Sequence, residues 1–132
     1  MYRYRLAGVL LIGAFLATSV QAQFAPQQST QGGVTVAVTP EQFGKTDPLW
    51  TFRIALDTHS QDLSDDLLQS ASLVDGSGRE SKPVAWDGAA PGGHHRGGVL
   101  KFKAIDPPPT QIELRITRAG ETTARTFRWE MK

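Results

Sequence analysis

Residues 49–59 read LWTFRIALDTH, which is the clearest strand pattern in the chain. Apolar residues occupy every second position from residue 50 to residue 56, and smaller or polar residues lie between them. Successive side chains of a strand point to opposite faces, so this period of two predicts a half-buried strand. The residues that should face the core are Trp50, Phe52, Ile54 and Leu56.

Three other stretches alternate in the same way, namely VTVAV at 34–38, QIELRITR at 111–118 and TARTFRWEM at 123–131. The last two flank the turn sequence AGET and therefore predict a hairpin. Within this hairpin, Glu113 and Arg128 lie on the polar face, where an ion pair across the two strands is expected.

The middle of the chain contains turn signals. Leu73 and Val74 run into DGSG, which predicts a hairpin whose second arm covers residues 82–86. Pro83 limits this arm to an edge or a short strand, because proline has no N–H group for the ladder. Before this hairpin, Ser64 is predicted to cap a brief helical turn that crosses between two sheets.

Residues 86–98, WDGAAPGGHHRGG, predict a long loop, after which a strand starts at Val99 or Leu100. The count is then about seven short strands in about 100 residues, which is typical of an immunoglobulin-like sandwich. We therefore predict an all-β fold, a single antiparallel sandwich over residues 34–132. The chain has no cysteine, so the disulfide of antibody domains is missing.

The first 22 residues have the features of a secretory signal peptide. Two arginines precede an apolar run of 12 residues, 6–17, and small residues at 20 and 22 mark a cleavage site. A membrane-spanning helix needs about 20 apolar residues. We therefore predict cleavage after Ala22, no membrane span in the mature chain, and a periplasmic or secreted protein. Residues 23–33, QFAPQQSTQGG, predict a flexible leader.

Charge excludes one class of partner. The chain has 14 basic and 13 acidic residues, and two of the basic ones lie in the predicted signal peptide. The mature chain therefore has a formal charge of −1. Nucleic-acid binding needs a concentrated basic surface, so we predict no nucleic-acid partner.

The placement of the three histidines indicates a binding site. His59 follows Asp57 by two residues, so both point to one face, where the carboxylate can orient the imidazole. His94 and His95 lie between glycine pairs in a loop that can meet the end of the 49–59 strand, because sandwich loops gather at two ends. Imidazoles suit copper or zinc. The candidate metal ligands are therefore His59, His94 and His95, although adjacent histidines need not both bind one ion.

Arg96 supports an alternative interpretation. A guanidinium group in a glycine-rich loop can anchor that loop by an ion pair, for which Asp57, Asp62 and Asp87 are candidate partners. The histidines and Arg96 would then form a purely structural network. The protein would be a structural or interaction module of the cell envelope, and its partner would be another envelope protein.

No pattern in the chain indicates catalysis. The sequence DGSGR at 75–79 lacks the spacing of a nucleophile elbow. Ser60 and His59 are neighbours that point to opposite faces of a strand, so they are poorly placed to act together. We therefore predict a protein that is not an enzyme and has no catalytic residues.

The order of these motifs resembles that of small exported bacterial immunoglobulin-like β-sandwich proteins of uncertain function. The shared pattern is LDTHS, then DL, a tryptophan-glycine turn, GGHHR-x-G-V-L and a terminal R-x-F-x-W, over residues 50–131. The resemblance implies no established activity. It implies that His59, the two loop histidines and Arg96 belong to one pattern, compatible with a metal site and equally with a fold-specific polar network.

Overall fold

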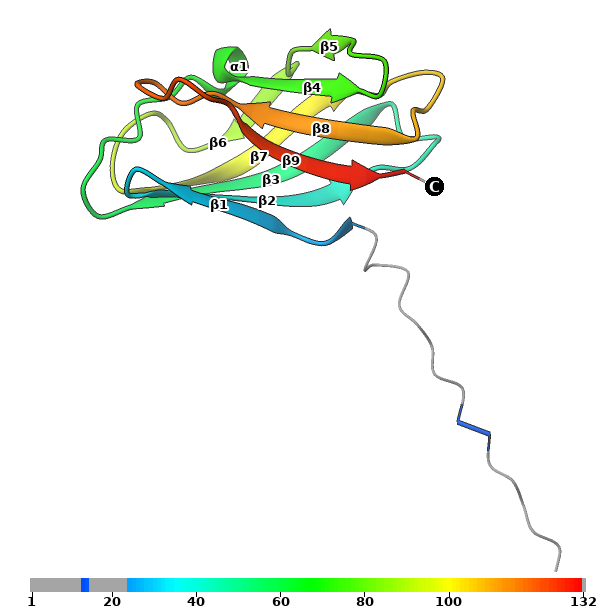
Figure 1. Ribbon diagram of the computed structural model, residues 1–132, viewed down its shortest axis with the longest axis horizontal. Coiled ribbons are helices and arrows are strands. Elements are labelled where there is room, and N and C mark those ends of the chain that lie inside the picture. Colours follow the sequence, from blue (N-terminus) through cyan, green and yellow to red (C-terminus); the bar gives the residue numbers. More distant parts are fainter. Residues whose placement is uncertain (1–12, 15–23, 132) are drawn as a thin grey trace, which may run out of the picture.

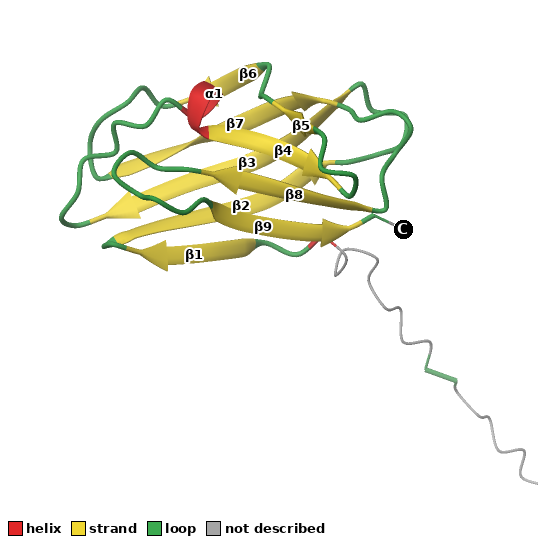
Figure 2. Ribbon diagram, turned by 45° about the horizontal axis from the view of Figure 1, so that its top comes forward, coloured by secondary structure: helices red, strands yellow, loops and turns green. Residues whose placement is uncertain are grey.

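The computed structural model describes residues 13–14 and 24–131. The predicted signal peptide therefore lies outside the described residues, except for Gly13 and Ala14. The described chain folds into two antiparallel sheets that face each other (Figures 1 and 2). None of the helices in residues 13–14 and 24–131 has the length and apolar character needed to cross a membrane.

The first sheet has five strands in the order β1-β2-β3-β7-β6, and the second has four in the order β5-β4-β8-β9. The strands of the first sheet are β1 (Gln27–Gln31), β2 (Val34–Gln42), β3 (Leu49–Thr58), β7 (His95–Lys103) and β6 (Ala85–Gly88). Those of the second are β5 (Glu80–Ser81), β4 (Ala71–Asp75), β8 (Gln111–Ile116) and β9 (Arg125–Glu130), and α1 is Leu67–Ser70.

This strand order confirms the predicted immunoglobulin-like sandwich. The order β2-β3-β7-β6 corresponds to strands A-B-E-D of immunoglobulin domains, and β4-β8-β9 corresponds to C-F-G. Strand β1 adds an edge to the first sheet, and β5 adds an edge to the second. The described residues therefore form nine strands, where the sequence predicted about seven.

The core lies between the sheets and follows the predicted alternation. The inward residues of β3 are at most 1% exposed, and Phe52 packs edge-on against Phe102 with ring centroids 5.7 Å apart. Burial of one such side chain contributes about 1.5–3 kcal/mol. The buried apolar side chains from β8 and β9 are Ile112, Leu114, Ile116, Phe127 and Trp129.

Strand β1 corrects the prediction of a flexible leader over residues 23–33. Residues 27–31 pair with β2, from Gln27 opposite Val38 to Gln31 opposite Val34. The turn between them is Gly32-Gly33, and both glycines have positive φ, 57° and 77°. Positive φ at both central residues defines the type I′ turn, whose twist matches that of a hairpin. Gln23 lies outside the described residues.

Side chains of β9 hold β1 in place. Arg125 donates hydrogen bonds to the carbonyls of Ser29 and Gln31, each at 2.9 Å. Trp129 donates its indole N–H to the carbonyl of Ala25 at 3.0 Å. The amide of Gln27 bonds both the N–H and the carbonyl of Arg128. These residues, which are distant in sequence, provide hydrogen bonds to a polar strand that has little apolar surface to bury.

The stretch 86–98 is also more regular than predicted. Residues 85–88 form β6 and pair with β7, which starts at His95 and not at Val99 or Leu100. Only residues 89–94 form the connection. The predicted hairpin after Leu73 is limited to β4 and the two residues of β5, after which the chain leaves for the other sheet around Pro83.

The predicted helical crossing is present, but its cap is different. The short helix α1 lies between β3 in the first sheet and β4 in the second. Its N-cap is Asp66, whose carboxylate accepts a hydrogen bond from the N–H of Leu68 at 3.1 Å, and not Ser64. The crossing is further fixed by Asp65, which is 4% exposed and accepts a hydrogen bond from the guanidinium group of Arg118 at 3.0 Å.

The expected ion pair between β8 and β9 is confirmed. Glu113 lies opposite Arg128, and their side chains are 2.9 Å apart. Burial raises the pKa of Glu113, but hydrogen bonds from Arg115 and Arg128 outweigh it and lower the pKa below its ordinary value.

We predict that Gly98→Ala destabilises the sandwich far more than Gly97→Ala. A Cβ at Gly98 would lie 2.5 Å from the Cα of Gly88 and 2.8 Å from the Trp86 ring. Such overpacking costs about 1–3 kcal/mol. A Cβ at Gly97 would have its nearest contact at 3.8 Å, so that neighbouring variant is the matched control. Urea unfolding of both variants measures the difference, and equal losses would contradict this packing.

We also predict that Asp75 contributes stability that acid removes. Hydrogen bonds from the Ser77 hydroxyl and from Arg79 lower the pKa of this carboxyl from 3.8 to about 2. Because the unfolded chain takes up the proton first, the contribution is complete above the ordinary pKa and disappears as the pH falls to about 2. The difference in unfolding free energy between the native chain and Asp75→Asn should therefore shrink from pH 5 to pH 2. A difference independent of pH would exclude this role.

Candidate functional site

The position of Arg96 decides where the histidines point. Arg96 lies opposite the core residue Leu56 and is 2% exposed. Because neighbouring residues of a strand point to opposite faces, His95 points outward from the same sheet. There it lies opposite Asp57 of β3.

The guanidinium group of Arg96 binds backbone carbonyls. It donates to Ala89 at 3.2 Å, to Leu63 at 3.3 Å and to Asp65 at 2.5 Å. The central carbon of the guanidinium group, Cζ, lies 5.7 Å from the centre of the Trp86 ring. Arg96 therefore anchors the connection, as one interpretation expected, but the expected acidic partners are wrong.

None of the three predicted acids pairs with Arg96 in the described part of the chain. The carboxylate of Asp57 pairs with His95, and that of Asp87 pairs with Lys101 at 2.6 Å. Asp62 contributes its carbonyl to Arg118 at 3.4 Å. Arg96 binds carbonyls because its guanidinium group lies among backbone segments of the loops. The buried carbonyls there need hydrogen-bond donors, and the guanidinium group has five N–H groups to donate.

The 89–94 connection folds back over the end of β3, an arrangement that the sequence left open. The N–H of Thr58 donates to the carbonyl of His94 at 2.9 Å. The N–H of Gly92 donates to the carbonyl of Leu63 at 2.8 Å, and the N–H of Leu63 donates to Gly93 at 3.4 Å. These bonds bring His94 of the connection and His95 at the start of β7 to the same end of the sandwich as His59, the residue that follows β3.

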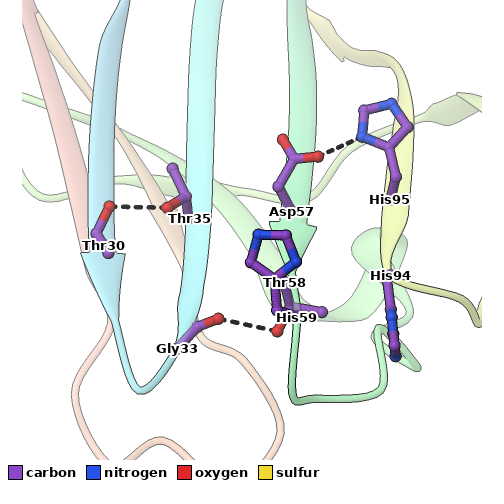
Figure 3. Close-up of a pocket in the computed structure, with 8 residues that line it drawn as sticks. All are labelled: Thr30, Gly33, Thr35, Asp57, Thr58, His59, His94 and His95. Atoms are coloured by element: carbon purple, nitrogen blue, oxygen red, sulfur yellow. Dashed lines mark hydrogen bonds and ion pairs between the residues drawn. The ribbon is translucent and has the colours of Figure 1, made fainter.

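All three histidines line one pocket of about 680 Å³, which we call the histidine pocket (Figure 3). It lies where the end of β3 meets the start of β7 and the β1–β2 turn. Its lining residues are Thr30, Gly33, Thr35, Asp57, Thr58, His59, His94 and His95. The three imidazoles are exposed, so a ligand can reach them.

Within the histidine pocket, Asp57 holds His95. The Asp57 carboxylate contacts Nδ1 of His95, and the two residues are directly opposite each other on β3 and β7. When Nδ1 carries the proton of this bond, Nε2 presents a free electron pair. This carboxylate–histidine arrangement orients many metal-binding imidazoles.

The other two histidines lie differently. Figure 3 shows His59 beside Asp57, whereas His94 lies below His95 with its ring directed away from the Asp57–His95 pair. Among residues 13–14 and 24–131, no three histidine, cysteine or acidic side chains gather closely enough to hold a metal ion. The structure thus brings the predicted ligands to one pocket without assembling them around one point.

Two threonines of this pocket were not predicted from the sequence. Thr30 and Thr35 flank the Gly32-Gly33 turn, and their hydroxyls are 2.8 Å apart. Thr35 lies opposite Asp57, so one row of outward residues runs from Thr30 to His95. The available signal was the Gly-Gly dipeptide directly before the strand pattern at 34–38, because two glycines can form a type I′ hairpin turn.

The comparisons with protein-family models, curated proteins and solved structures found no match to the chain. The resemblance to exported bacterial sandwich proteins therefore stays a prediction.

We predict that Arg96→Met destabilises the fold by about 2–4 kcal/mol, because buried carbonyls of the 89–94 connection and of the crossing lose their donor. Methionine keeps much of the apolar volume, so the loss reports the hydrogen bonds. Arg53→Met is the control, since Arg53 is 58% exposed and pairs only with Glu41 in the part of the chain described. Thermal unfolding measures both variants, and a loss at Arg96 as small as that at Arg53 would contradict the anchoring role.

Proposed function

We propose that this protein is an exported, non-enzymatic β-sandwich that binds a copper or zinc ion in the histidine pocket. The observation that carries the proposal is that His59 and the distant pair His94 and His95, the chain's three histidines, line this one exposed pocket. The sequence pattern of residues 1–22 supports export, to the periplasm or outside the cell.

The different positions of Arg96 and His95 favour ligand binding over a purely structural network. Arg96 anchors the 89–94 connection from the core side. The side chain of His95 is 73% exposed and adds little to the packing of the fold. An exposed imidazole oriented by a carboxylate is available to a ligand.

The ligand set proposed is His59 and His95, with Asp57 as the orienting residue. His95 lies opposite Asp57, so it is a diagonal neighbour of His59 on the same face. Diagonal neighbours have Cα atoms about 7–8 Å apart, within reach of two long side chains that rotate toward each other. Water or a donor from another molecule completes the coordination, and His94 plays a minor part.

The structure around β1 gives less support to the alternative function, a protein-interaction module of the cell envelope. That interpretation needs a free leader or an open edge at β1. Arg125 and Trp129 bind the carbonyls of Ala25, Ser29 and Gln31, so this segment is fixed against β9 and is not a free leader.

We expect the chain from Gln23 to bind one Zn²⁺ or Cu²⁺ ion, as measured by calorimetric titration. Loss of His59 or His95 by substitution with alanine should weaken binding by at least about tenfold, and Asp57→Ala by about tenfold. His94→Ala should change the affinity less than either. Combined replacement of all three histidines should abolish binding.

Asp87→Ala is the matched control, because Asp87 is an exposed acid on the same sheet that does not line the pocket. Its affinity should equal that of the native chain. Unchanged affinity in the triple histidine variant would refute the proposal, and so would an Asp87 effect as large as that of Asp57.

A further inference from the structure

A second pocket, of about 300 Å³, lies at the opposite end of the sandwich. Phe24 precedes β1, Phe43 follows β2, and Met131 follows β9, so the pocket lies at the end of the sandwich where β1 begins and β9 ends (Figure 1). We call it the Phe24 pocket. Its lining residues are Phe24, Phe43, Lys45, Pro108, Pro109, Thr110 and Met131.

The floor of this pocket belongs to a stack of parallel aromatic rings. The centroids of Phe24 and Phe43 are 5.4 Å apart at an interplanar angle of 16°. Those of Phe43 and Trp50 are 5.1 Å apart at 18°. Trp50 is buried, whereas Phe43 and Phe24 are partly exposed. The stack thus runs from the core to the surface, where a planar ring can extend it.

Lys45 is the one charged residue among those lining the Phe24 pocket. Its side chain is exposed, and the structure shows no ion pair or hydrogen bond of its ammonium group within residues 24–131. An apolar pocket with a single cation at its edge favours a ligand that has an apolar body and one negative charge.

We propose that the Phe24 pocket binds a small aromatic carboxylate. The aromatic ring packs against Phe24 and Phe43, between Pro108 and Met131, and the carboxylate pairs with Lys45. A volume of about 300 Å³ admits one or two fused rings and is at the lower limit for small-molecule sites. This site shares no residue with the histidine pocket, so carboxylate binding here is tested independently of the proposed metal binding.

The test is a titration of the chain from Gln23 with 2-naphthoate, followed by amide chemical shifts in NMR spectra. A ligand of this size should bind with a dissociation constant of about 1 mM or below. The saturable shifts should centre on Phe24, Phe43 and Met131. Neutral 2-naphthamide, which has the same rings, should bind about fivefold more weakly because it lacks the pair with Lys45.

Two variants separate the charge from the stacking. Lys45→Gln should reduce naphthoate affinity to that of naphthamide and leave naphthamide unaffected. Phe24→Ala should weaken both ligands by about fivefold or more. Lys103→Gln is the control, because Lys103 is an exposed lysine at the same end that does not line this pocket.

Four results would overturn the proposal. They are no saturable shift at about 5 mM ligand, shifts centred on the histidine pocket, equal binding of the two ligands, and an equal loss in the Lys45 and Lys103 variants. The full-length chain tests one competing occupant, its own N-terminal segment. If the full-length chain already shows the naphthoate-bound shifts and excludes the ligand that the shorter chain binds, the segment and not a carboxylate is the natural occupant.

Discussion

The burial of the Arg96 guanidinium group is the constraint on which the histidine end depends. A buried charge is tolerated only where its donors are satisfied, and here the acceptors are the carbonyls of Leu63, Asp65 and Ala89. Those carbonyls belong to the crossing and to the β6–β7 connection, so one side chain fixes both segments at once. Strand alternation then turns His95 outward to Asp57. The inward position of Arg96 therefore places the neighbouring His95 imidazole on the exposed face of the sheet.

Arg118 and Arg125 repeat this solution at the same end of the sandwich. Arg118 joins the β8–β9 turn to the buried carboxylate of Asp65, and Arg125 joins β9 to Glu121 and to the β1–β2 hairpin. The chain has no cysteine with which to link its loops. Removing one partner of such a buried group costs far more than its mutual attraction contributes, because the remaining group is left unpaired. The guanidinium groups thus specify where each loop lies, while the apolar core provides most of the stability.

Local alternation was enough to predict β3, β8 and β9, because each buries one face of large apolar residues. It failed where distant groups decide the structure. Strand β1 has no apolar face. It is held by Arg125, which binds its carbonyls, and by Trp129, which binds the carbonyl of Ala25 just before it, both about a hundred residues away in the chain. The start of β7 contains glycine where a core residue is expected, because the Trp86 ring covers Gly98. The period of two still placed His59 beside Asp57, whereas Thr30 and Thr35 were missed together with β1.

The two ends of the sandwich offer different chemistry on one rigid frame. Strand β3 leads from Trp50 of the aromatic stack to Asp57, a span of seven residues and therefore about 23 Å at about 3.3 Å per residue. Charges in solution are screened over about 8 Å at physiological ionic strength, so a cation at one end has little direct effect on an anion at the other. Strand β3, which lies between the two pockets, is packed in the core, and the structure shows one conformation of it. Occupancy of the histidine pocket and of the Phe24 pocket should therefore be energetically independent, as expected of a scaffold that presents two separate surfaces.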